Sequence, residues 1–133
     1  MKYVKLLLCI VLSLCLQGCP GEPDEATDGS FTIKNTSNEI MYVYYVTSTS
    51  EILPNYFAVQ PSLIINIAGS WNETFGDSYF EKNKKLWVLI FKKSTVENHT
   101  WQEIKDQGIY DKRYELTFDK LKSMNYEIIY DGN

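Results

Sequence analysis

Few side chains in this sequence combine into a recognisable catalytic group. His99 is the only histidine, and it stands in Asn98-His99-Thr100, just before the expected start of a helix. Zinc sites need several histidine or cysteine ligands, and a serine nucleophile in a Gly-x-Ser-x-Gly turn is absent from the sequence. We therefore expect His99 to be an exposed loop residue.

Paired carboxylates are the remaining route to catalysis, because glycoside hydrolysis uses two acids that flank the scissile bond. The acids of this chain stand singly along expected strands and turns, although folding can bring two of them together. Residues 106–111 (DQGIYD) lack the alternating oxygen ligands of a calcium loop, and the sequence contains no glycine-rich phosphate loop. We predict no metal, no cofactor and no enzymatic activity.

Aromatic side chains, 14% of the sequence, are the other candidates for a functional surface. Most of them, such as Trp87 and Phe91, lie in apolar runs and are expected in the core. Trp71 instead lies in the polar stretch GSWNETFGD, where an exposed indole would stack on a sugar or a peptide. The alternative is that it folds back over a sheet. Trp71 is the candidate ligand-binding residue.

The N-terminus has the composition of a secretory signal peptide. Lys2 and Lys5 precede an apolar run over residues 6–16, interrupted only by Ser13. A membrane-spanning helix needs about 20 apolar residues, so this run is too short to be an anchor. A positive start followed by a short apolar segment predicts a cleavable signal peptide over residues 1–18.

Leu16-Gln17-Gly18-Cys19 resembles the bacterial lipobox, with Gln17 as the one unusual choice. The resemblance implies cleavage between Gly18 and Cys19 and a diacylglyceryl thioether on Cys19. Several acyl chains on one residue anchor a protein stably, whereas one chain binds only marginally. The other two cysteines precede the cleavage point, so the mature domain is expected to lack disulfides. Membrane attachment through this lipid anchor is the predicted localisation.

Residues 19–30 (CPGEPDEATDGS) are rich in proline, glycine and acids, and we expect them to form a flexible acidic tether. Glu22, Asp24 and Glu25 resemble the acidic export signals of Bacteroidota lipoproteins, which implies an outer-membrane protein exposed at the cell surface. Solubility of the tether is the alternative explanation, and both remain open here.

Residues 31–133 are expected to form a single domain built from short strands. Apolar and aromatic runs bounded by turn residues predict strands at 31–35, 39–47, 62–68, 86–91, 109–116 and 125–130. Residues 69–85 are expected to be a long polar connection. The strand at 39–47 (EIMYVYYVT) is apolar on both faces, so an exposed apolar patch is expected there.

Two short helices are expected between the last strands. Thr100 and Glu103 have the spacing of a capping box, and Gly108 is placed to end that helix in a left-handed conformation. Thr117 is expected to cap the second helix. Because strand runs dominate, the sequence predicts a mainly β domain, a small antiparallel β-sandwich with two short connecting helices.

Residues 31–130 resemble small, uncharacterised lipoproteins of Bacteroidota. The resemblance is carried by segments in one order and at similar spacing: Phe31-x-Ile33-x-Asn35, Tyr42-Val-Tyr-Tyr45, Leu86-Trp-Val-Leu-Ile-Phe91, Thr95-Val-Glu97, Thr100-Trp-Gln-Glu-Ile104, Lys112-Arg-Tyr-Glu-Leu-Thr117 and Met124-Asn-Tyr-Glu-Ile-Ile-Tyr130. It implies a compact β-rich domain on an envelope lipoprotein, and it implies no activity.

The leading hypothesis is a membrane-anchored lipoprotein whose sandwich is a binding module for a glycan or a protein. A net charge of −4 with scattered basic residues argues against nucleic acid as a partner. The second hypothesis is a structural or assembly subunit of an envelope complex, which predicts an unprotected sheet edge. A carboxylate-dependent hydrolase is the third, and it predicts a cleft holding two acids.

Overall fold

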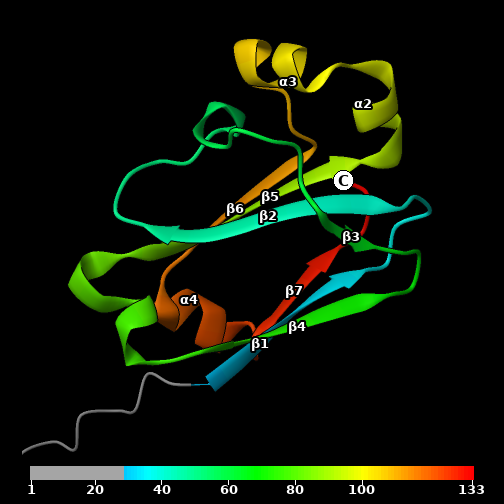
Figure 1. The fold of residues 1–133 in the computed structure, drawn as a ribbon. Coiled ribbons are helices and arrows are strands. Elements are labelled where there is room, and N and C mark those ends of the chain that lie inside the picture. The colour runs from blue at the N-terminus through cyan, green and yellow to red at the C-terminus, as the bar shows by residue number, and fades with distance from the viewer. Residues whose placement is uncertain (1–28) are drawn as a thin grey trace, which may run out of the picture.

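The structure, a computed structural model, describes residues 29–133, which form two β-sheets packed face to face (Figure 1). The small sheet has the strand order β4-β1-β7, and the large sheet has the order β3-β2-β5-β6. The strands are β1 (Gly29–Asn35), β2 (Met41–Ser48), β3 (Leu63–Ile65), β4 (Ser70–Phe75), β5 (Lys85–Lys92), β6 (Lys112–Leu116) and β7 (Glu127–Tyr130). The predicted mainly β sandwich is confirmed.

Short helical segments connect the strands. The α-helices are α2 (Lys93–Asn98), α3 (Trp101–Gln107) and α4 (Phe118–Ser123), and the 3₁₀ turns are η1 (Pro54–Tyr56), η2 (Asp77–Tyr79) and η3 (Glu81–Asn83). Thr100 and Glu103 form the expected capping box of α3, and Gly108 ends that helix with φ of 65°. Thr117 caps α4 through the backbone N–H of Lys120. The sequence had suggested two helices; α2, which has no side-chain cap of its own, is the additional one.

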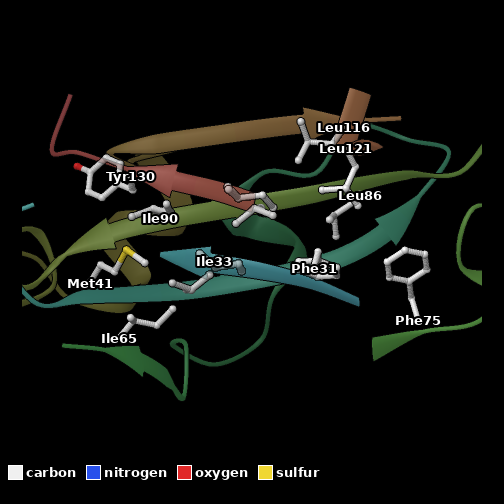
Figure 2. Packing of buried hydrophobic residues seen from close by; sticks show 13 residues of the cluster. Phe31, Ile33, Met41, Ile65, Phe75, Leu86, Ile90, Leu116, Leu121 and Tyr130 are labelled. Carbon is white, nitrogen blue, oxygen red and sulfur yellow. The ribbon is translucent and has the colours of Figure 1, made fainter. Parts of the chain in front are cut away.

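The first hydrophobic core lies between the two sheets (Figure 2). Alternate side chains of each strand point into it, as the period of two of a β-strand requires. Phe31 and Ile33 of β1 meet Val88 and Ile90 of β5 there, and all four are at most 1% exposed. Leu121 of α4 closes one end of this core.

A second core covers the opposite face of the large sheet. Trp87, Leu89 and Phe91 of β5 are buried there together with Ile52 and Ile104. In Figure 1, α2, α3 and η1 lie over this face of the sheet. Both faces of β5 are therefore buried, which is why its sequence is an unbroken apolar run.

The expectation of an exposed apolar patch on the strand at 39–47 is wrong. Met41 and Val43 of β2 are buried in the first core, and Tyr44 packs in the second core, stacked on Phe57 with ring centroids 3.7 Å apart. The strand is apolar on both faces because each face contributes to a different core. The exposed large apolar side chains lie elsewhere: Tyr56, Val59, Ile64, Ile67, Trp71 and Ile129.

The expectation of a long polar connection over residues 69–85 is also wrong. Its first part is β4, which pairs antiparallel with β1 and places Trp71 opposite Ile33. Ser70, Asn72 and Thr74 of β4 lie on its outer face and are exposed to solvent. Among the predicted strands, the one at 62–68 shortens to β3 (Leu63–Ile65), and β1 begins at Gly29, two residues before the expected domain start.

The sandwich is not wholly antiparallel, because β7 pairs parallel with β1. Parallel neighbours need a long connection between them, and here almost the whole domain separates the two strands. β1 is therefore the central strand of the small sheet, with β4 on one side and the last strand of the chain on the other.

Candidate functional site

Trp71 lies at one margin of the sandwich, where residues of two edge strands, β4 of the small sheet and β3 of the large sheet, line the same groove. Trp71, Glu73 and Phe75 share the face of β4 that is directed at the large sheet, because Phe75 on this face is buried in the first core. Trp71 is nevertheless 41% exposed, since it is at the end of β4 where the core thins out. It belongs to a strand, and not to the loop that its polar surroundings suggested.

Three side chains meet at this margin. The Tyr45 hydroxyl donates to Glu73 Oε2 over 2.5 Å, and the Trp71 Nε1–H donates to the same oxygen over 3.4 Å. An indole N–H lies in the plane of its ring, so the accepting carboxylate lies at the edge of the indole. The ring faces of Trp71 are therefore not occupied by this carboxylate.

A groove of about 380 Å³ opens beside these residues, between the two sheets. Aromatic and aliphatic side chains predominate among its lining residues, but polar and apolar atoms contribute about equally to its exposed surface. The lining residues are Val43, Tyr44, Tyr45, Ser62, Leu63 and Trp71.

Burial and the neighbouring Glu73 both shift the pKa values of two tyrosines at this margin. Burial raises the pKa of the Tyr45 phenol, and the hydrogen bond to Glu73 raises this pKa further. Burial also raises the pKa of Tyr79 strongly, and the negative charge of Glu73 is the second cause. No lysine or arginine of the described residues forms a salt bridge with Glu73. The margin therefore carries an unpaired negative charge.

A second hollow brings two acids together, Glu39 and Glu97, beside Lys93. Glu97 pairs with Lys93 over 3.5 Å, and Glu39 accepts from the backbone N–H of Ser94 over 3.1 Å. The hydrogen bonds from Ser94 lower the pKa of Glu39. A general acid at neutral pH needs a raised pKa, so Glu39 has the opposite of the required shift.

The other sequence candidates lie apart from the groove. His99 stands between α2 and α3 and is half-buried, so the expectation of an exposed loop residue is wrong. Gly18 and Cys19 lie outside the described residues. Within residues 29–133, no three histidine, cysteine, aspartate or glutamate side chains are grouped to hold a metal, and no helix is long and apolar enough to cross a membrane.

Sequence reasoning identified Trp71 but missed Tyr45 and Glu73. The signal for Glu73 was present in the two-residue spacing of Trp71, Glu73 and Phe75, which puts them on one face of a strand. Tyr45 had no such signal, because its strand is aromatic on both faces and 25 residues separate it from Trp71. No family model, no curated protein and no solved structure gives a significant match to this chain.

Proposed function

We propose that the chain is a lipid-anchored envelope lipoprotein whose sandwich binds the sugar ring of a glycan in the groove beside Trp71. One observation carries the ligand class: a partly exposed indole has a carboxylate at its edge and lines a groove of mixed polar and apolar surface. No catalytic step is part of the proposal.

The arrangement suits a pyranose for two physical reasons. The axial C–H groups of a pyranose form an apolar face that packs on the negative face of an aromatic ring. The hydroxyl groups project from the rim of the same sugar ring and need hydrogen-bond acceptors. Glu73, at the edge of the indole, accepts such charge-assisted hydrogen bonds. A cation held by the aromatic ring alone would instead sit over the ring face.

The assembly-subunit alternative is less well supported, because three of the four edge strands, β3, β4 and β6, carry protective features. β3 is only three residues long. β4 carries Glu73 on its inward face, and β6 includes Lys112, Arg113 and Glu115. Short edge strands and charged edge residues are the usual devices that prevent edge-to-edge pairing. The hydrolase alternative needs a second acid near Glu73, and the residues that line the groove include none.

The proposed membrane localisation of the protein rests on the lipobox-like segment Leu16-Gln17-Gly18-Cys19. Its test is the incorporation of radiolabelled palmitate into wild type and Cys19→Ala, combined with protease treatment of intact cells. We expect label only in the wild type and removal of the wild-type domain by protease. Label retained by Cys19→Ala would refute the lipid anchor, and protection from protease would refute surface exposure.

The ligand class is tested with the full chain labelled with 5-fluorotryptophan, in a detergent without a sugar headgroup. Fluorine resonances are expected from Trp71, Trp87 and Trp101, and the first is assigned by its loss in Trp71→Phe. Uncharged methyl pyranosides of the gluco, galacto and manno series should shift the Trp71 signal while leaving Trp87, which is buried in the second core, unchanged. No shift of Trp71 with any of the three sugars or their oligosaccharides would refute glycan binding in this groove.

A further inference from the structure

We infer that the groove discriminates by charge: it accepts uncharged or amino-bearing pyranoses and excludes acidic ones such as uronates. This inference rests on the proposed glycan binding and adds the chemical class of the sugar. It follows from the charge of Glu73 and from its hydrogen bonds with Tyr45 and Trp71.

Glu73 is hydrogen-bonded to two groove-lining residues, Tyr45 and Trp71, and presents acceptors beside the groove, whereas the lining side chains offer few donors. An ionised carboxylate only accepts hydrogen bonds. The hydroxyl proton of Tyr45 and the indole proton of Trp71 are both directed to Oε2 of Glu73. Neither proton is therefore available to an incoming anion, and among the groove-lining residues Ser62 alone keeps a side-chain donor that no described hydrogen bond uses. A ligand in this groove must therefore donate the hydrogen bonds that it forms with Glu73.

The negative charge is also uncompensated. The four salt bridges of the described residues involve Lys34, Lys85, Lys93 and Arg113, and none of these reaches Glu73. The negative charge of Glu73 also acts on groups that it does not hydrogen-bond, because it contributes to the raised pKa of Tyr79. An anionic substituent on a sugar stacked on Trp71 would enter this negative potential without a counter-charge.

The position of the carboxylate makes the discrimination specific to the rim of the sugar. Glu73 lies at the edge of the indole, and the carboxyl group of a uronate projects from the rim of the pyranose. Two like charges about 4 Å apart in water repel enough to weaken binding about fivefold, and more where the groove excludes water. An amino group at the same place would be attracted instead.

The test compares three methyl hexopyranosides with the corresponding methyl hexopyranosiduronates, which differ only in a carboxylate replacing the terminal CH₂OH. The reporter is the fluorine resonance of Trp71 in the full chain, as above. We expect each uronate to bind about fivefold more weakly, or worse, than its uncharged partner at low salt. The difference should shrink as salt rises, because salt screens partly exposed charges.

Glu73→Gln is the matched variant, because glutamine keeps the shape and an acceptor oxygen for Tyr45 but removes the charge. In this variant the two sugars of each pair should bind equally, while unchanged Trp87 and Trp101 resonances verify the fold. Uronates that bind wild type as tightly as the uncharged sugars would overturn the inference and leave glycan binding intact. A preference that persists in Glu73→Gln would also overturn it. If neither kind of sugar shifts Trp71, the proposed function itself fails.

Discussion

Replacement of Asn35 by alanine tests whether one buried amide ties the ends of the two sheets together. Asn35 is 1% exposed at the end of β1. Its Nδ2 lies 2.7 Å from the carbonyl oxygen of Glu39, 3.1 Å from that of Ile65 and 3.2 Å from that of Asn66. Its Oδ1 accepts from the backbone N–H of Ser37 over 3.0 Å and from the Ser37 hydroxyl over 2.6 Å. One side chain thus joins the β1–β2 turn to the β3–β4 connection.

The cost of Asn35→Ala follows from the groups that find no replacement. The Ser37 hydroxyl keeps the Glu39 carbonyl as a partner, over 3.1 Å, and the Asn66 carbonyl keeps the Gly69 N–H, over 2.9 Å. The Ile65 carbonyl remains in the ladder between β2 and β3, opposite Met41. The Ser37 N–H, which donates to Oδ1 of Asn35, is left without this acceptor. Each net hydrogen bond contributes about 1 kcal/mol and each orphaned buried group costs about 1–3 kcal/mol, so we expect a loss of about 3 kcal/mol.

Urea unfolding followed by tryptophan fluorescence measures this loss. With a urea slope of roughly 2 kcal/mol/M, a loss of about 3 kcal/mol lowers the midpoint by about 1.5 M. Thr36→Ala is the matched control, because Thr36 is exposed and its backbone N–H still donates to the Tyr130 carbonyl over 2.9 Å. If the free energy of unfolding of Asn35→Ala were within about 1 kcal/mol of wild type, the reasoning would be refuted, because a single hydrogen bond contributes about that much.

Asn35→Asp adds a pH dependence of known sign. The introduced carboxylate would face the three carbonyl oxygens that Nδ2 now contacts, so its pKa in the folded state should rise above the unfolded value of about 3.9. The folded state then binds more protons than the unfolded state between these two values. The stability of the variant relative to wild type should therefore increase as the pH falls through the folded pKa. A constant difference between pH 7 and pH 4 would contradict the placement of Nδ2.

Three further outcomes are expected. Thr100→Ala removes the hydroxyl that caps α3 and should lower the free energy of unfolding by about 1 kcal/mol, with Thr100→Ser close to wild type in urea unfolding. Gly69→Ala would place a Cβ 2.9 Å from the carbonyl oxygen of Asn66 and should lower the free energy of unfolding by about 1–3 kcal/mol. Gly76→Ala is the control, because nothing lies within 4 Å of the added Cβ. Its free energy of unfolding, measured in the same way, should stay within about 0.5 kcal/mol of wild type. Burial raises the pKa of Tyr130 to about 12, so between pH 10 and pH 12 the folded phenol keeps its proton while an unfolded one, with a pKa near 10, loses it. The domain should therefore lose stability as the pH rises from 10 towards 12. In a pH titration followed by tyrosinate absorption, the native protein should ionise at higher pH than the unfolded chain.

Local signals in the sequence predicted the elements that depend on local physics. The capping box at Thr100, the left-handed Gly108 and the cap at Thr117 each need only neighbours within a few residues, and all three are confirmed. The strand at 86–91 is confirmed as the centre of β5 because a strand buried on both faces is an apolar run whatever covers it. The β-sandwich class followed from the frequency of such runs.

The elements that were missed depend on distant partners. β4 has polar side chains on its outer face, and only pairing with β1 and burial of Phe75 distinguish it from a loop. The parallel pairing of β7 with β1 has no local signal, because either direction buries Ile128 equally well. The expected patch on β2 failed for the same reason: the sequence shows that both faces are apolar but cannot show that α3 and η1 cover one of them.

The position of Glu73 has consequences for both the fold and the proposed function. A charge on the inward face of an edge strand disfavours pairing with another chain, since the added strand would have to bury it. The same inward direction brings the carboxylate to Tyr45 and to the edge of Trp71. On the proposal made above, a single residue therefore keeps the edge of β4 unpaired and gives the groove beside it an acceptor for sugar hydroxyls. A residue used only for edge protection could be replaced by lysine without loss of binding, whereas the proposal requires that Glu73→Lys abolish the response of Trp71 to uncharged sugars.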